Sequence, residues 1–309
     1  MQDQFYGKWR INLANTFMDV TSDKIECPNS FNVSESLELD LLERGVALSS
    51  SGSVRSGRWT PVANQGFEVR LGQNVYFFFS DWDDATGSPI CNRTRYGYSN
   101  VIGLAQQRTF RCASAEMLRP TVSNIQPVNE AAKASQYEEP EGHKMWVGSD
   151  LPVNFSWSDV NGISYLPPVF DQESCGSCYA VASTQAMMAR IMVATNKSIN
   201  FDAPESRLSV QHILDCSSYS QSCDGGFGEE VAKFSEDFGI LTVGDYKAYG
   251  ANVQSCDAEP LIANGKAKRY HFTNQQYLGG YFGADNTVDS MMWELYRYGP
   301  FPVSVYVDD

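Results

Sequence analysis

The stretch DQESCGSCYA, residues 171–180, determines how this sequence is interpreted. It places Cys175 and Cys178 directly before CYAVASTQAMMARIMVATN (178–196), where apolar residues recur at helical spacing. At the N-terminus of that helix, unpaired amides and the helix dipole favour an anion, so we expect the pKa of the Cys178 thiol to fall. A thiolate is the nucleophilic form of cysteine. Gln172, six residues upstream, has a side-chain amide that forms a candidate oxyanion hole with the backbone amide of Cys178.

Three other interpretations of the two cysteines remain open from the residues alone. A zinc site requires further ligands, but the sequence has no second Cys-x-x-Cys pair and its three histidines are scattered. A thioredoxin-type redox pair requires a βαβ context, which is missing. Both cysteines can also be purely structural. None of these interpretations gives Gln172 a role.

Composition limits the class of protein. The 309 residues carry a net charge of −14, which argues against nucleic-acid partners because these favour a basic face. No run approaches the roughly 18 apolar residues of a membrane-spanning helix, so we expect no membrane partner. The start, MQDQFYGKWR, shows no signal peptide. Eight cysteines indicate disulfides and a secretory history.

Charge divides the chain unevenly. Residues 1–115 hold 11 basic and 12 acidic residues, a net −1, whereas residues 116–309 hold 12 and 25, a net −13. We expect a β domain over 1–115, a polar connector over 116–150, and a second domain over 151–309.

The first domain shows the period of β-structure. In GFEVRL (66–71), Phe67, Val69 and Leu71 alternate with other residues, and a Gly-Gln-Asn turn leads into VYFFFSDW (75–82). Many short strands with glycine-rich turns favour an antiparallel barrel or sandwich. Further strands are predicted at 7–13, 36–42 and 98–104. In the second domain the patterns predict helices at 209–216 and 228–238 and a strand at 299–307.

The segment Cys-Gly-Ser-Cys-Tyr (175–179) resembles the nucleophile segment of papain-family cysteine proteases. Trp157 stands in that family's place for a tryptophan. Cys223-Asp224-Gly225-Gly226 resembles the family segment whose glycine backbone binds substrate; taken alone, Gly225-Gly226 is equally an ordinary turn.

More narrowly, the chain resembles the cathepsin C (dipeptidyl peptidase I) family. The segments that carry this resemblance lie in both halves: Gly7-Lys8-Trp9, Asn64–Val69, Cys91–Thr94, Asp237-Phe238-Gly239, Tyr277–Gly280 and Gly299-Pro300. The resemblance implies an α+β protein in which an N-terminal antiparallel β-barrel, the exclusion domain, is joined to a papain-like domain that is incomplete in its C-terminal, β-rich half.

The family reaction removes dipeptides from the free N-terminus of peptides and proteins. Cys178 would form an acyl-enzyme, Gln172 would stabilise the oxyanion, and Gly225 and Gly226 would bind substrate. The exclusion domain would act as a steric wall beyond two residues. The resemblance also implies homotetramers in a lysosomal or secretory compartment.

The family binds chloride, and the resemblance implies the Tyr277 hydroxyl and the backbone amides of Phe227 and Glu229 as its ligands. The family usually has tyrosine at position 229, and a carboxylate beside an anion is unfavourable. Tyr277 is otherwise a plain core aromatic residue. No metal site is expected.

Disulfides and glycosylation follow the same resemblance. The implied disulfides are Cys27–Cys112, Cys175–Cys223 and Cys216–Cys256, with Cys91 left over. The sequons begin at Asn32, Asn92, Asn154 and Asn196.

The catalytic base has no match. The family histidine lies about 130–150 residues after the cysteine, and we expect no catalytic role for His143, His212 or His271. Asp3 does not align with the aspartate that binds the substrate amine. We therefore expect a chain truncated at both ends, or one whose remainder is a separate C-terminal chain, and no turnover by this chain alone. The alternatives are a non-catalytic papain-like protein that binds peptides and an endopeptidase that has lost exclusion.

Overall fold

The computed structural model divides the chain into two compact units. The first comprises Met1–Val20, Ile25–Lys144 and Gly280–Ala284, and the second comprises Thr21–Lys24, Met145–Gly279 and Asp285–Asp309. The structure describes residues 5–19, 25–28, 30–42, 45–50, 54–62, 65–101, 109–120, 151–258, 267–273, 275, 277–278 and 287–305. Most of the predicted connector therefore lies outside the described residues.

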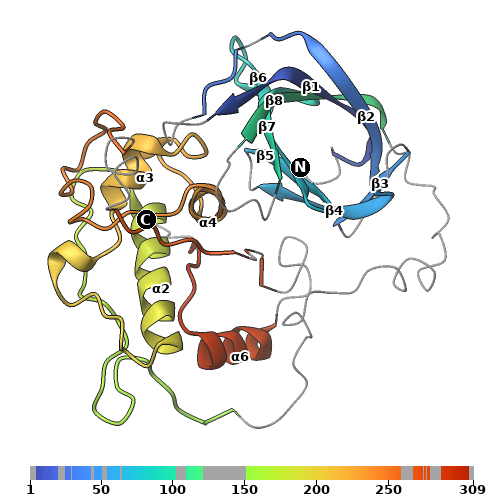
Figure 1. Ribbon diagram of the computed structural model, residues 1–309. Helices are drawn as coiled ribbons and strands as arrows, with labels where there is room; N and C mark the ends of the chain where they lie inside the picture. Colours follow the sequence, from blue (N-terminus) through green and yellow to red (C-terminus); the bar gives the residue numbers. More distant parts are fainter. Residues whose placement is uncertain are drawn as a thin grey trace. The chain divides into compact units, whose positions relative to one another are not determined.

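The first unit contains a closed barrel of antiparallel strands that follow one another in chain order (Figure 1). The strands are β1 (Gly7–Asp19), β2 (Val33–Leu41), β3 (Val46–Ser49), β4 (Ser56–Val62), β5 (Gly66–Leu71), β6 (Asn74–Asp83), β7 (Ser88–Val101) and β8 (Thr109–Pro120). β1 closes the barrel, because it places Trp9 opposite Leu39 of β2 and opposite Met117 of β8. The sequence left a barrel and a sandwich open, and the structure is a barrel.

Aromatic residues fill the barrel interior. Trp9, Phe67 and Phe78 are fully buried, with ring centroids 5.0 Å apart for Trp9 and Phe67 and 5.1 Å apart for Phe67 and Phe78. The indole N–H of Trp9 donates to the Phe5 carbonyl at 2.8 Å, so the large apolar ring is buried with its polar atom satisfied. The period-2 pattern of β5 thus places Phe67 in the core, as predicted.

A disulfide links the segment before β2 to β8. Cys27 and Cys112 are bonded across 85 residues of sequence, and the hydroxyl of Tyr98 on β7 donates to the nearby Ile25 carbonyl at 3.4 Å. The bond restricts the unfolded chain, which is its main stabilising effect in the chain-entropy model. β8 extends to Pro120, so residues 116–120 of the predicted connector belong to this strand.

The second unit is built on helices (Figure 1). They are α2 (Cys178–Ala194), α3 (Val210–Cys216), α4 (Gly228–Asp237) and α6 (Val288–Tyr298), with two short 3₁₀ turns, η3 (Pro204–Ser206) and η4 (Ser222–Asp224). α2 is the longest and buries Ala180, Met188 and Met192 among other residues. The predicted helices after Cys178, at 209–216 and at 228–238 are confirmed to within a few residues.

Two predictions for the C-terminal region were wrong or missing. The predicted strand at 299–307 does not form over residues 299–305, because two prolines lack a ladder donor and the Pro300 carbonyl accepts from Arg190 Nε at 2.7 Å. α6 was not predicted, although Thr287 and Ser290 form a capping box at its start. Its Glu294 pairs with Arg190 of α2 at 2.7 Å.

Over the described part of the chain, none of the helices has both the length and the apolar character needed to cross a bilayer.

Replacing a buried leucine of the barrel should unfold it far more readily than replacing an exposed one. Leu39 is fully buried and Leu118 is 37% exposed. We expect Leu39→Ala to lower the free energy of unfolding by about 2–5 kcal/mol, and Leu118→Ala by less than about 1 kcal/mol. Amide hydrogen exchange of the barrel strands measures this unit separately; equal losses in the two variants would contradict the assigned core.

Candidate active site

The Cys178 side chain is exposed at the first residue of α2. The first backbone amides of a helix have no partner within it and face outward from the helix end. No acidic residue lies in the first turn of α2. The position predicted from the sequence is therefore the one observed, with the sulfur accessible beside a set of helix N–H groups.

A disulfide and a glycine hold the loop that leads into α2. Cys175 is bonded to Cys223, and the Gly176 amide donates to the Cys223 carbonyl at 3.0 Å. A Cβ atom on Gly176 would lie 2.4 Å from that carbonyl oxygen, so no other residue fits without displacing the backbone. The loop before Cys178 is thus fixed against the segment that follows Cys223.

Tyr249 joins the two ends of this loop. Its hydroxyl donates to the Gln172 carbonyl at 2.7 Å and lies 2.8 Å from the Ser177 hydroxyl, while its ring packs on Phe170 with centroids 4.9 Å apart. The Gln172 side-chain amide donates to the Cys175 carbonyl at 2.9 Å. Tyr249 lies 72 residues after Ser177 in the sequence. Its hydroxyl therefore closes the loop that contains Gln172 and Cys178. The position of Tyr249 was not predicted from the sequence.

The predicted substrate-binding glycines lie beside the start of α2. Gly225 has a φ of 125°, a backbone conformation that favours glycine. A Cβ on Gly226 would lie 2.6 Å from the Tyr179 ring, so this segment packs directly on the residue that follows Cys178. Burial raises the pKa of Tyr179 to about 12. Its hydroxyl donates to the Ser222 carbonyl at 3.1 Å and lies 3.1 Å from the Ser220 hydroxyl.

The Phe227 amide, one of the implied chloride ligands, already has a partner. It donates to Glu230 Oε2 at 2.9 Å. Glu229 adds a second carboxylate in the first turn of α4, and Tyr277 is half-buried. An anion in contact with the Phe227 amide would displace or face the Glu230 carboxyl group, so these residues do not fit chloride.

Glu230 is a buried carboxyl group that was not predicted from the sequence. Burial raises its pKa to about 8, against the lowering effect of the Phe227 hydrogen bond, and the charge of Glu229 raises it further. A glutamate near the start of a helix is usually an exposed capping residue, so its position in the sequence did not indicate burial.

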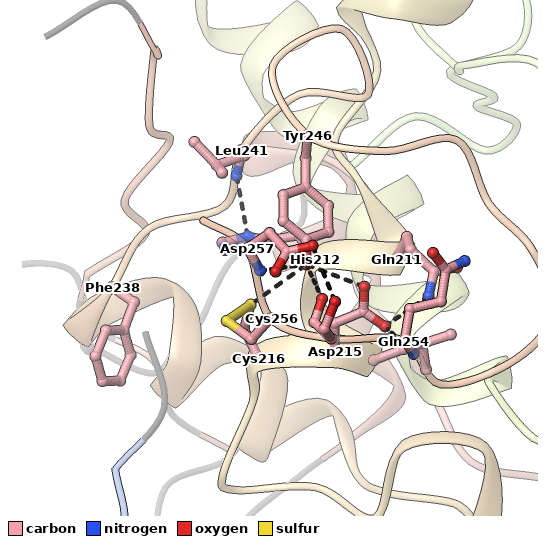
Figure 2. The surroundings of a disulfide bond; sticks show 12 residues. Gln211, His212, Asp215, Cys216, Phe238, Leu241, Tyr246, Gln254, Cys256 and Asp257 are labelled. Atoms are coloured by element: carbon pink, nitrogen blue, oxygen red, sulfur yellow. Dashed lines mark hydrogen bonds between the residues drawn. A yellow bond between two sulfur atoms is a disulfide. The ribbon is translucent and has the colours of Figure 1, made fainter. Parts of the chain in front are cut away.

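None of the histidines in the described residues is placed as a base for Cys178. His212 is fully buried, its Nδ1 accepts from the Leu241 amide at 3.3 Å, and its ring packs between Phe234 and Tyr246. Figure 2 shows it beside the Cys216–Cys256 disulfide. His271 places Nδ1 3.2 Å from the Glu236 carbonyl, and His143 lies outside the described residues.

The surroundings of the Cys216–Cys256 disulfide form a structural network. Asp215 accepts from the Gln211 side chain and the Gln254 amide at 2.7 Å each and from the Tyr246 hydroxyl at 3.0 Å (Figure 2). These contacts satisfy a buried carboxylate. The network holds the end of α3 and leaves no group for chemistry.

The other predicted positions are found as follows. The three disulfides pair the cysteines that the resemblance implied, and Cys91 Sγ lies 3.7 Å from the Pro89 carbonyl. Trp157 donates through its indole N–H to the Leu295 carbonyl at 2.7 Å. The four sequon asparagines, Asn32, Asn92, Asn154 and Asn196, are exposed. The described residues contain no group of three His, Cys, Asp or Glu side chains that would hold a metal ion.

Known proteins match both parts of the chain. A family model described as papain family cysteine protease matches residues 151–309, and one described as cathepsin C exclusion domain matches residues 1–116. Cathepsin C of Schistosoma mansoni is 27% identical over 98% of this chain and 74% of its own. Dipeptidyl aminopeptidase 1 of Plasmodium falciparum is 38% identical over 39% of this chain and 18% of its own, and cathepsin Z of Onchocerca volvulus is 30% identical over 50% and 51%.

Removing the Tyr249 hydroxyl should loosen the loop without disturbing the ring. We expect Tyr249→Phe to lower the free energy of unfolding by about 1–2 kcal/mol and to speed amide exchange across residues 172–178. Tyr165→Phe is the control, because the Tyr165 hydroxyl contacts Asn196 at 2.6 Å, away from the loop. Unchanged exchange over 172–178 in Tyr249→Phe would show that the hydroxyl does not hold the loop.

Proposed function

Because the chain belongs to the papain family of cysteine proteases and carries a cathepsin C exclusion domain, we propose that it cleaves peptide bonds through Cys178 and releases dipeptides from free N-termini. The observation that supports this most directly is the exposed thiol at the start of α2, in the loop that Tyr249 closes around Gln172. Each of the proposed roles uses a group described above.

In the proposed reaction the Cys178 thiolate attacks the scissile carbonyl carbon. The C–N bond then breaks, the amine leaves with a proton, and the acyl group remains on sulfur as a thioester that water hydrolyses. One Gln172 amide hydrogen is used by the Cys175 carbonyl, which leaves the second to donate to the oxyanion together with the Cys178 amide.

The Gly225-Gly226 backbone is proposed to bind the substrate backbone. Its packing on Tyr179 keeps it next to the nucleophile, and the absence of side chains lets an extended peptide approach closely. The dipeptide limit is the part of the proposal that depends on the exclusion domain.

No described residue is proposed as the group that accepts the proton of the Cys178 thiol. His212 is engaged with Leu241 and buried among aromatic rings, and His271 is engaged with the Glu236 carbonyl. We therefore propose that turnover needs a base from outside the described residues, in this chain or in a separate C-terminal chain.

The lack of a histidine base for Cys178 among the described residues also favours a second candidate function, that of a papain-like protein that binds peptides without cleaving them. It predicts peptide binding that survives Cys178→Ala. The first proposal predicts instead that the thiol contributes to binding of a peptide whose reactive end is an aldehyde, because sulfur adds to that carbon.

The substrates, the cellular compartment and the oligomeric state are also proposals. Substrates would be peptides and proteins with free N-termini, and the acidic charge argues against nucleic acid. Three disulfides support an oxidising route to a lysosomal or extracellular compartment. A homotetramer remains a proposal drawn from the family.

Two electrophilic reagents that react with the Cys178 sulfur separate the roles of Cys178 and Gln172. Iodoacetamide alkylates a thiol without forming an oxyanion, whereas a peptidyl aldehyde forms a tetrahedral adduct that an oxyanion hole stabilises. We expect Gln172→Ala to leave alkylation of Cys178 unchanged and to weaken the adduct of a dipeptidyl aldehyde about 100-fold. Mass spectrometry locates the label and a competition assay measures the affinity.

The exposed Gln254 supplies the control for this test. Gln254→Ala should affect neither reagent, and blocking the amino end of the aldehyde should abolish its binding. The proposal fails if the dipeptidyl aldehyde does not bind, or if Cys178→Ala binds it as well as the unchanged chain does.

A further inference from the structure

Glu230 acts on the backbone segment that leads from the glycines into α4. Its carboxyl group reaches back three residues and accepts the Phe227 amide hydrogen at Oε2, 2.9 Å away. Phe227 directly follows Gly225-Gly226, so one side chain determines where this segment ends and the helix begins. The residues directly before Phe227, Gly225 and Gly226, belong to no helix or strand, so the hydrogen bond to Glu230 is made at the end of a loop.

The carboxyl group is buried without a charged partner. Glu230 is 0% exposed, and its second oxygen, Oε1, has no hydrogen-bond partner among the residues that the structure describes. Lys233, one turn along α4, is paired with Asp237 at 2.8 Å and does not compensate Glu230. An ionised carboxylate in such a place is costly, so the neutral acid is favoured.

The groups around Glu230 are either negatively charged or neutral. Glu229, from the same helix, contributes a negative charge, and Tyr179 of α2 contributes a neutral phenol whose own pKa is raised by burial. Ser183 of α2 and Pro302, which lie against Gly228 at the start of α4, carry no charge. Nothing described around Glu230 supplies a positive charge in place of its proton.

We propose that the Glu230 carboxyl group, in its neutral form and in place of a chloride ion, holds the Phe227 amide and so positions the Gly225–Phe227 backbone. The importance of that backbone for substrate binding rests on the proposed function. The hydrogen bond between Glu230 and the Phe227 amide does not rest on that function. Because of this bond, we expect the segment to respond to pH and not to chloride.

The direction of the pH response follows from the two states of the segment. When the segment is closed, the pKa of Glu230 is about 8; when it opens to water, the pKa returns towards the ordinary 4.5. The closed state therefore binds the proton more tightly. The proton stabilises the closed state fully below pH 4.5, and this stabilisation is lost as the pH rises to about 8. Between these two values the equilibrium constant for opening rises about tenfold per pH unit.

Amide hydrogen exchange at Phe227, corrected for the intrinsic exchange rate and measured by NMR, tests this directly. We expect the protection of this amide to fall about tenfold per pH unit between the two pKa values and then to level off. Glu230→Gln keeps an acceptor that does not ionise, so protection should remain and the slope should disappear. Glu230→Leu removes the acceptor and should lower protection about tenfold in acid, with no slope.

Two further measurements separate this role from its alternatives. Glu229→Gln removes the neighbouring charge, so the slope should remain and end at lower pH. In the unchanged protein, protection should be equal in chloride and gluconate buffers of the same ionic strength. A slope that survives Glu230→Gln, a slope abolished by Glu229→Gln, or protection that rises with chloride would each overturn the proposal.

The result is independent of the proposed chemistry. The same measurements on Cys178→Ala, which has no nucleophile, should give the same slope at Phe227. Failure of the aldehyde test would leave these results unaffected, and loss of the slope would leave Cys178 reactivity unaffected.

Discussion

The candidate site depends on the close contact between Gly176 and the Cys223 carbonyl. The Cys175–Cys223 disulfide joins the two segments covalently at this contact. Neither of the segments it joins belongs to a sheet or a long helix, so no ladder of backbone hydrogen bonds places them. The covalent bond and the missing side chain do so instead. From that contact it follows that the start of α2 and the Gly225-Gly226 backbone lie together, with the Tyr179 ring filling the space that a Cβ on Gly226 would need.

Two remote side chains then refine the two segments in different ways. Tyr249 holds the Cys178 loop through its hydroxyl, which donates to the Gln172 carbonyl and lies 2.8 Å from the Ser177 hydroxyl. Glu230 holds the other segment through a carboxyl group whose pKa is raised by burial to about 8. The Glu230 hydrogen bond is therefore expected to be tightest in acid.

Local patterns were enough to predict antiparallel strands in the first unit and the place of Cys178, whereas the choice of a barrel came from the family resemblance. The alternation through Phe67, Val69 and Leu71 gives strand period directly, and a helix that begins at Cys178 exposes its first residue. Tyr249 and Glu230 were not predictable in this way, because their roles arise only when distant segments meet or when a helix end is buried. The strand predicted at 299–307 failed for a related reason: an apolar alternation forms a strand only beside a partner, and Arg190 takes the Pro300 carbonyl instead.

The closure of the barrel has a consequence for how the protein handles its own substrates. Extended peptides add readily to an open sheet edge, where unpaired amides and carbonyls capture them regardless of sequence. Every strand of the described barrel is paired on both sides, since β1 bonds to β8 as well as to β2. An extended peptide therefore meets no edge strand in the described barrel.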